Sequence, residues 1–382
     1  MGGAERSLLD FFASLRAADP GIALELIAGA EGVFLEQARA LGARARALPY
    51  PAALARLGDA GRSRLLGALG RASLSAPAAA PDLIHTNGFK MHVLGVRAAP
   101  RAVPVLWHVH DYISPRPLMM RLMRLHAGRC AAAVANSQGV ADDLRAVCGP
   151  ALRIFPIHNA VDLDRFSAAG PALDLDRLAG LAPPALPVVR VGLVATMARW
   201  KGHEVFLRAL KMLPTDSPVR GYVIGGTLYQ TEGSQYELGD LRRLAASLGL
   251  ESHVGFTGFV DEPAAAMRAL DVVVHASTQP EPFGLVIAEA MACGRVVVVS
   301  GGGGAAELVR PGEDALVHEA GRASALAERI GELARDPALR AALGARAEQS
   351  ARRRFARARL ADELMPIYRE LSVNAARPAC RT

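Results

Sequence analysis

The chain has 382 residues, of which 51% are hydrophobic and 21% charged, so it is long enough for two globular domains and is neither disordered nor fibrous. Its formal charge of +7 comes from 44 basic against 37 acidic residues, with nearly all of the excess in residues 1–170. Because aromatic residues are few, at 5%, this mild excess gives no indication of nucleic-acid binding.

The sequence lacks a stretch of roughly 20 apolar residues, the length that a membrane-spanning helix needs, and it does not open with a signal-peptide pattern. The four cysteines lie far apart, without a Cys-x-x-Cys pair, which argues against a zinc site or a disulfide framework. We therefore expect a cytoplasmic protein.

Short apolar segments alternate with helical segments twice along the chain, a pattern typical of parallel sheets covered by helices on both faces. The predicted strands are 22–27, 82–85, 103–109, 131–135 and 153–157, then 188–195, 221–224, 254–256, 271–275 and 296–300. The pattern predicts an α/β fold with an N-terminal domain over 1–170 and a C-terminal domain over 188–352. Residues 171–187, rich in alanine, proline and glycine, form the predicted linker. Residues 353–382 are expected to form a C-terminal helix that packs back on the N-terminal domain.

Two carboxylates, Glu281 and Glu289, bracket a predicted junction between a loop and a helix. Pro282 and Gly284 place Glu281 in the loop, whereas Leu285 opens a segment of helix-forming composition that carries Glu289. The amides at the start of such a helix favour a phosphate group, and carboxylates accept hydrogen bonds from sugar hydroxyls. This arrangement suits a nucleotide-sugar, which has both parts.

Several motifs occur in a fixed order around this junction: Gly2-Gly3-Ala4-Glu5, Asn159-Ala160-Val161-Asp162, Lys201-Gly202, and Glu281 to Glu289 with Pro-Phe-Gly inside. In these motifs the chain resembles the family-4 retaining glycosyltransferases of the GT-B fold. The resemblance implies two Rossmann-like domains that face each other across a cleft. It also implies a nucleoside-diphosphate-sugar donor, a glycan or lipid-linked acceptor, retention of anomeric configuration, and neither a metal ion nor another cofactor.

On the donor side, the resemblance implies that Glu289 accepts both ribose hydroxyls and that Glu281 meets hydroxyls of the sugar. Lys201 is expected to pair with the departing diphosphate; it is one of three lysines among 44 basic residues. Thr196 stands where many relatives have a second phosphate-binding cation, and Arg199 is the candidate substitute. The remaining implied donor contacts are made by Gly2, Gly3, Phe283, Gly284 and Leu285. For Glu289 and Lys201 the alternative is an ordinary solvated surface residue.

His110 resembles the active-site histidine of the family, so the implied catalytic residues are His110, Lys201 and Glu281. His108 is a rival, since side chains two positions apart point to the same face of a strand. The expected acceptor side consists of Asn87, His108, Asp111 and Ser137. Asn87 and Ser137 are equally suited to capping the helices that follow them.

The resemblance also bears on the start of the chain. Relatives open with an apolar strand that leads into the Gly-Gly-x-Glu loop, whereas here Met1 directly precedes Gly2. We therefore expect the N-terminal domain to lack its first strand, and the natural protein to begin upstream of Met1.

Residues 116–125 are basic and apolar at helical spacing, which suits either peripheral contact with a membrane or packing on a core. Two other functions remain open on the same architecture. One is a nucleotide-sugar epimerase, which needs no acceptor, and the other is an inert protein that binds nucleotide-sugars.

Overall fold

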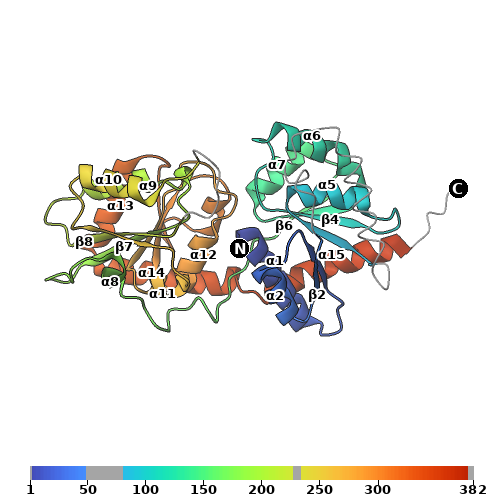
Figure 1. Cartoon of the computed structure of the whole chain (residues 1–382), viewed down its shortest axis with the longest axis horizontal. Helices are drawn as coiled ribbons and strands as arrows, with labels where there is room; N and C mark the ends of the chain where they lie inside the picture. The colour runs from blue at the N-terminus through green and yellow to red at the C-terminus, as the bar shows by residue number, and fades with distance from the viewer. Residues whose placement is uncertain (1, 49–80, 227–233, 377–382) are drawn as a thin grey trace. The chain divides into compact units, whose positions relative to one another are not determined.

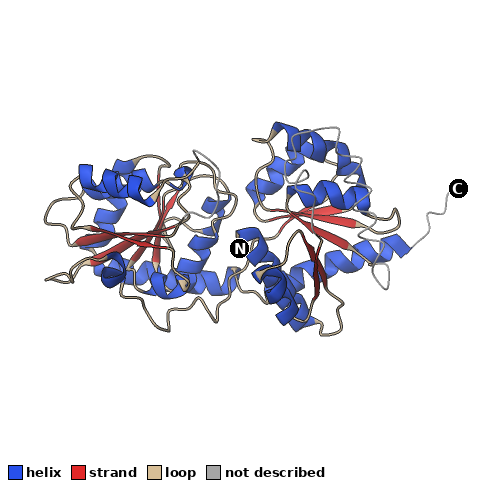
Figure 2. Cartoon of the chain, in the orientation of Figure 1, coloured by secondary structure: helices blue, strands red, loops and turns tan. Residues whose placement is uncertain are grey.

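A computed structural model describes residues 2–48, 81–226 and 234–376. The chain divides into two compact units: unit 1 takes Met1–Ala160 and Arg357–Thr382, and unit 2 takes Val161–Ala356. Figure 1 shows the elements of both units, and Figure 2 shows helices on both faces of the strands within each. The two Rossmann-like α/β domains predicted from the sequence are confirmed.

Unit 2 is built on a six-stranded parallel sheet of order β12-β11-β10-β7-β8-β9. Its strands are β7 (Val189–Val194), β8 (Val219–Ile224), β9 (Val254–Gly258), β10 (Val272–His275), β11 (Val296–Ser300) and β12 (Leu316–His318). The chain winds outward in one direction from β7 to β9 and in the other from β10 to β12. The order therefore reverses between β7 and β10, and ligands of doubly wound folds bind at this point, beyond the carboxyl ends of the strands.

Helices cover both faces of this sheet, because strands such as Val296–Ser300 are apolar on both sides. One core packs the sheet against α9 (His203–Lys211), α10 (Leu238–Ser247) and α13 (Ala323–Arg335). The other packs it against α11 (Pro263–Arg268), α12 (Leu285–Ala292) and α14 (Pro337–Arg354). In Figure 1 the helices of the first core and those of the second lie on opposite sides of the strands.

Unit 1 contains a four-stranded parallel sheet of order β3-β4-β5-β6. Its strands are β3 (Ile84–Asn87), β4 (Val105–Val109), β5 (Ala132–Ala135) and β6 (Ile154–Pro156). On one face lie α5 (Phe89–Ala98), α6 (Pro117–His126) and α7 (Gln138–Cys148), and on the other α1 (Gly3–Ala18) and α15 (Arg359–Ala376). Phe11 and Leu364 pack in the same core, so the last helix of the chain is part of unit 1.

A second, two-stranded sheet in unit 1 pairs β1 (Glu25–Ala28) with β2 (Arg44–Ala47) in parallel, with α2 (Val33–Ala40) between them in sequence. These two strands share a small core with α1. Helix α1 begins at Gly3, with Gly2 as its N-cap.

Two strands were not predicted, for local reasons. β2 has the sequence Arg-Ala-Arg-Ala, which lacks β-branched or aromatic residues, and β12 is three residues long. The predicted linker, 171–187, lies inside unit 2, because α8 (Leu175–Ala179) buries Leu175 in the core of that unit. The chain passes between the units at Ala160/Val161 and at Ala356/Arg357 instead.

A buried charged cluster holds α8 on the sheet. The carboxylate of Asp176 accepts hydrogen bonds from Arg190 at 3.1 Å, Arg220 at 2.7 Å and the hydroxyl of Tyr222 at 2.7 Å. Burial by itself would raise the pKa of Asp176, but these three donors outweigh it and lower the pKa. The carboxylate is therefore ionised and fully paired.

The part of the chain that the structure describes includes no helix that is both long and apolar enough to cross a lipid bilayer.

Replacing Asp176 by alanine is expected to destabilise unit 2 by about 3 kcal/mol, since two arginines and a tyrosine hydroxyl then lose their acceptor in a mostly buried place. Amides of β8 should then exchange with deuterium roughly 100-fold faster. The control is Asp174→Ala, which removes the N-cap of α8 (2 residues earlier) and should cost about 1 kcal/mol. Equal effects of the two substitutions would contradict the importance of the cluster.

Candidate functional site

The loops that follow β7 and β10 carry most of the predicted donor-site residues. The first forms a short 3-10 helix, η3 (Arg199–Lys201), and the second carries Ser277 and Glu281. Both leave the carboxyl ends of neighbouring strands at the point where the strand order reverses. This is the place where a doubly wound sheet offers a ligand crevice.

Backbone contacts hold the two loops together. Gly202 has φ of +78°, and a Cβ there would lie 1.9 Å from the carbonyl oxygen of Ala276. Next to it, the amide of Thr278 donates a hydrogen bond to the carbonyl of Trp200 at 2.7 Å. Only glycine allows this approach, which explains the glycine after Lys201.

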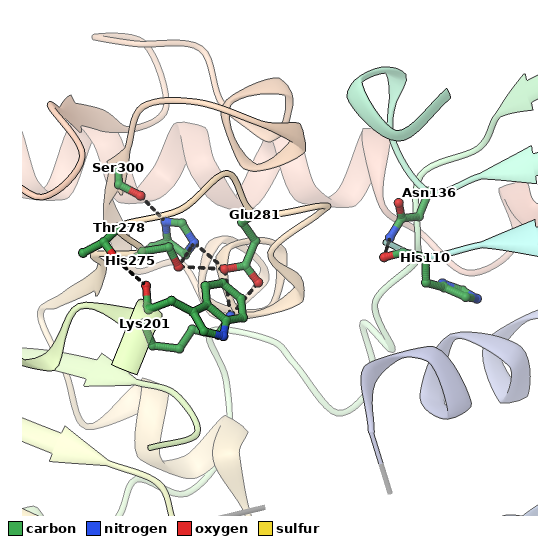
Figure 3. Close-up of polar contacts among 9 residues, drawn as sticks. His110, Asn136, Lys201, His275, Thr278, Glu281 and Ser300 are labelled. Carbon is green, nitrogen blue, oxygen red and sulfur yellow. Dashed lines mark hydrogen bonds and ion pairs between the residues drawn. The ribbon is translucent and has the colours of Figure 1, made fainter. Parts of the chain in front are cut away.

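Lys201 and Glu281 form an ion pair across these loops (Figure 3). The lysine Nζ lies 2.6 Å from Oε1 and 2.7 Å from Oε2 of the carboxylate. Their side chains are 16% and 10% exposed, so solvent screens the pair little. The Nζ atom also lies 4.0 Å from the centre of the Trp200 ring.

Two further groups donate to the same carboxylate. The hydroxyl of Ser277 lies 2.7 Å from Oε2 of Glu281, and Nε2 of His275 lies 3.1 Å from it. On its other side, Nδ1 of His275 lies 3.1 Å from the hydroxyl of Ser300 (Figure 3). Burial by itself would raise the pKa of Glu281, but the Lys201 charge and the His275 hydrogen bond hold it well below its usual range. Glu281 is thus an acceptor of hydrogen bonds and not a proton donor.

A glycine turn packs against the backbone of Glu281. Gly303 pairs with Glu281 in an isolated parallel bridge, and its φ is +64°. A Cβ at Gly303 would lie 2.7 Å from the carbonyl oxygen of Glu281. The glycines 301–304 therefore let one loop pass directly along another.

The predicted junction between Glu281 and Glu289 is present. Helix α12 begins at Leu285, with Gly284 as its N-cap at φ of +90°, and Phe283 is buried before it. In the first turn, the amide of Ile287 donates to the carbonyl of Gly284 at 2.9 Å, and the positive end of the helix dipole there favours an anion. Glu289 lies on the helix and is 7% exposed, so it is not a solvated surface glutamate.

Arg199 lies at the start of η3 and stacks its guanidinium over the ring of Tyr236, 4.4 Å from the ring centre. Its backbone amide donates to the carbonyl of Ser234. At the start of the chain, Gly2 is the N-cap of α1 and its amide donates a hydrogen bond to Glu5 at 2.7 Å. Gly2 and Gly3 thus form the N-terminus of a 16-residue helix.

In unit 1, His110 follows the last residue of β4 and is held at two points. Its Nε2 lies 2.5 Å from Oδ1 of Asn87 at the end of β3. Its backbone carbonyl accepts a hydrogen bond from Nδ2 of Asn136 at 3.1 Å, as Figure 3 shows. The His110 ring packs on that of His108, with centres 4.0 Å apart. As expected for a strand, both histidines point to the same side.

Four histidines, His85, His92, His108 and His110, gather on β3, α5 and β4. Burial lowers the pKa of His85 to about 4 and that of His110 to about 3. It also lowers the pKa values of His92 and His108, where charge on the neighbouring histidines adds to the effect. All four are therefore neutral at pH 7.

The other predicted acceptor residues have structural contacts. His108 is completely buried, so in this structure it offers no surface to an acceptor. Ser137 is also buried and is the N-cap of α7, where its hydroxyl accepts from the amide of Val140. Asp111 forms an ion pair with Arg116 at 2.5 Å and accepts from the amide of Tyr112.

The sequence analysis missed the residues that hold Glu281 and His110 in place: His275, Ser277, Ser300 and Asn136. A signal for the first two was available, since the polar pair in His275-Ala276-Ser277 directly follows an apolar strand. Ser300 and Asn136 also stand at strand ends, at the last residue of β11 and the first after β5. Among the described residues, no group of three or more His, Cys, Asp or Glu side chains is arranged to hold a metal ion.

Comparisons with known families and structures match both halves of the chain. The Glycosyltransferase Family 4 model matches residues 1–165, and the Glycosyl transferases group 1 model matches residues 189–350. A D-inositol 3-phosphate glycosyltransferase of Rhodococcus opacus is 34% identical over 234 residues, which are 57% of this chain and 50% of that protein. The lipopolysaccharide core biosynthesis glycosyltransferase LpsE of Rhizobium meliloti is 28% identical over 208 residues, or 54% of this chain and 56% of that protein. The chain spans about half the length of the curated relatives it matches.

Similarity to solved structures extends over nearly the whole chain. Anabaena Alr3699/HepE in complex with UDP is 27% identical, with a TM-score of 0.80 and coverage of 97% of this chain and 96% of that one. The same protein in complex with UDP-glucose gives a TM-score of 0.79 at the same coverage. Sucrose-phosphate synthase from Thermosynechococcus elongatus, 23% identical with a TM-score of 0.75 over 95% of this chain and 92% of that one, shares the fold.

The neutral histidine cluster predicts that unit 1 loses stability in acid. In the unfolded chain histidine has a pKa of about 6.5, so below that pH the unfolded state binds more protons than the folded one. The free energy of unfolding then falls as the pH falls from about 6.5, and the contributions of His85 and His110 are fully lost below their folded pKa values of about 4 and about 3. The slope is at most about 1.4 kcal/mol per pH unit for each histidine.

Urea unfolding of a Trp200→Phe variant, in which Trp107 is the remaining tryptophan of the two in the chain, measures this slope in unit 1. His108→Leu should flatten this slope, because it removes one of the titrating histidines. Neither ring nitrogen of His108 has a hydrogen-bond partner among the described residues, so the substitution breaks no hydrogen bond of the ring. His253→Gln, at an exposed position of unit 2, controls for the loss of a histidine as such. An unchanged slope in His108→Leu would contradict the prediction.

Proposed function

The chain belongs to glycosyltransferase family 4, and from that premise we propose that it transfers a sugar from a nucleoside-diphosphate sugar to a hydroxyl group, with retention of anomeric configuration. The observation that carries this proposal is the Lys201–Glu281 pair, which lies in the loops at the strand-order reversal of unit 2. A cation, an ionised carboxylate and the N-terminus of α12 follow the two central strands there. These groups suit the phosphate and sugar parts of such a donor.

The relatives support a uridine nucleotide as the first donor to test. HepE, similar over 97% of this chain, was solved with UDP and with UDP-glucose. The names of the curated relatives, D-inositol 3-phosphate glycosyltransferase and LpsE of lipopolysaccharide core biosynthesis, support an acceptor with several hydroxyl groups. We therefore propose a glycan or lipid-linked acceptor, as in the synthesis of cell-surface polysaccharides.

In this proposal unit 2 holds the donor. Glu289, buried on α12, accepts hydrogen bonds from the ribose hydroxyls, and the amides of Gly284 and Leu285 meet the diphosphate. Glu281 accepts from hydroxyls of the sugar, which suits a carboxylate that stays ionised. Lys201 is already paired, so the incoming diphosphate shares its Nζ protons with Glu281 or displaces that carboxylate.

The reaction exchanges one bond for another at the anomeric carbon. The acceptor oxygen forms a bond to that carbon while the bond to the diphosphate oxygen breaks, and both events occur on the same face of the sugar. The acceptor proton passes to the departing phosphate, whose negative charge Lys201 and the helix amides stabilise. Glu281 orients the sugar and does not attack it.

Two rival functions give different products. An epimerase alters or releases the sugar without an acceptor, and an inert binding protein gives no turnover. Incubation with a panel of nucleotide-sugars, with and without a glycan acceptor, separates the three. Release of nucleoside diphosphate that depends on the acceptor supports transfer. Release or alteration of the sugar that is the same without an acceptor would favour the epimerase instead.

Glu289→Ala is expected to weaken binding of UDP-glucose by roughly 10- to 150-fold, since hydrogen bonds to a buried charged group are worth about 1.5–3 kcal/mol. Calorimetric titration measures the dissociation constant, and circular dichroism checks the fold. Glu319→Ala is the control, because its side chain is 66% exposed. Binding by Glu289→Ala that equals the control would refute the ribose assignment.

We also propose that unit 1 contacts the membrane that carries a lipid-linked acceptor. Helix α6 buries Met123 in the core, whereas Leu118 and Leu125 are 45% and 74% exposed. Arg121 is exposed between them on the helix. This face combines apolar and basic side chains, a combination that favours binding to an anionic bilayer.

Leu125→Glu is expected to reduce sedimentation of the protein with anionic lipid vesicles by roughly tenfold, because it replaces apolar area by negative charge. Leu186→Glu serves as the matched control: this leucine of unit 2 is 76% exposed. Equal vesicle binding by the two variants would exclude α6 as the contact.

A further inference from the structure

The side chain of Asn87 joins the start of α1 to His110. Its Nδ2 donates to the carbonyl oxygen of Ala4 at 3.0 Å, and its Oδ1 lies 2.5 Å from Nε2 of His110. Asn87 stands at the end of β3 and His110 directly after β4, and these two strands pair in parallel. One amide group thus bridges three elements of unit 1.

The chemistry of these contacts fixes the position of a proton. A carbonyl oxygen can only accept, so Ala4 requires the NH₂ of Asn87 and turns its oxygen toward His110. That oxygen also only accepts, so Nε2 of His110 must carry the hydrogen. Burial lowers the pKa of His110 to about 3, so the ring holds one N–H at pH 7 and Nδ1 keeps its lone pair.

Two hydrogen-bond acceptors, on residues that follow neighbouring strands, then lack donors among the described residues. Nδ1 of His110 is buried without a hydrogen-bond partner among the described residues. The same holds for Oδ1 of Asn136, whose amide is oriented because its Nδ2 donates to the His110 carbonyl. These residues follow β4 and β5, which pair directly up to Val109 and Ala135. A buried acceptor without a donor costs about 1–3 kcal/mol, which a donating group would recover.

We propose that Asn87 is a positioning residue that holds His110 as the Nε2–H tautomer, so that Nδ1 is the ring atom left to accept a hydrogen bond. The tautomer follows from contacts within unit 1 alone.

This arrangement limits what His110 does. Its single N–H is committed to Asn87, so the ring cannot give that proton to a substrate without breaking the contact. A group that meets the ring must supply the hydrogen itself, as a hydroxyl does and a phosphate or carbonyl oxygen does not. At this ring, Nδ1 can pair only with a hydrogen-bond donor.

Nitrogen NMR of the full chain tests the tautomer without any need for turnover. Protein labelled with ¹⁵N-histidine gives long-range ¹H–¹⁵N correlations that distinguish Nε2–H from Nδ1–H, and comparison with His110→Gln assigns the signals. We expect His110 to be a single Nε2–H tautomer at pH 7, with a ring proton that exchanges slowly with water.

Three variants separate the role of Asn87 from general loosening. Asn87→Ala should speed exchange of the Nε2 proton at least tenfold and allow the Nδ1–H form to appear. Asn87→Asp keeps an oxygen at Nε2 and should restore the protected signal. Asn159→Ala is the matched control, because Asn159 also tethers α1, by accepting from Ser7 at 2.7 Å, but is not bonded to the His110 ring; it should keep the protected signal.

An Nδ1–H tautomer in the wild type, or a protected Nε2 proton that survives Asn87→Ala, would overturn the proposal. If the wild type shows the Nε2–H tautomer but no sugar transfer, the proposed function fails and the positioning by Asn87 stands.

Discussion

The ion pair of Lys201 and Glu281 is the interaction on which the site of unit 2 depends. Two charges that are 16% and 10% exposed are stable only with close geometry and further hydrogen bonds, because removing them from water is costly. Ser277 and His275 supply those bonds to Glu281. The surrounding glycines serve the same end: Gly202 brings the lysine loop against Ala276, and Gly303 packs along the backbone of Glu281. An anionic ligand that enters must rearrange an interaction that already has its partners.

Unit 1 also buries polar side chains, but these are neutral. Burial keeps four neighbouring histidines uncharged at pH 7: His85, His92, His108 and His110. Hydrogen bonds of Tyr368 to His85 and of Thr86 to His92 satisfy part of their polarity. Within the described part of the chain, Nδ1 of His110 has no hydrogen-bond partner, whereas the charges of Lys201 and Glu281 in unit 2 are paired.

The extent to which the sequence predicted the site can be seen in individual residues. The junction between Glu281 and Glu289 was predictable because Pro282, Gly284 and the helix-forming segment after Leu285 are local signals. The partnership of Lys201 with Glu281 was not, since the two residues are 80 positions apart and their distance depends on neighbouring strands. Ser137 shows the opposite case: its local role as the cap of α7 was one of the two alternatives, and the structure contains that cap.

The sequence by itself determined the α/β class, ten of the strands and the family, because apolar periodicity and ordered motifs are properties of short segments. It did not reveal β2 or β12, whose short and unremarkable sequences become strands through pairing with β1 and β11. The tertiary structure alone decided that 171–187 belongs to unit 2, that His108 is buried and that Asn87 reaches both Ala4 and His110. Each of these depends on contacts between segments distant in the chain, and such contacts follow from packing and not from local propensity.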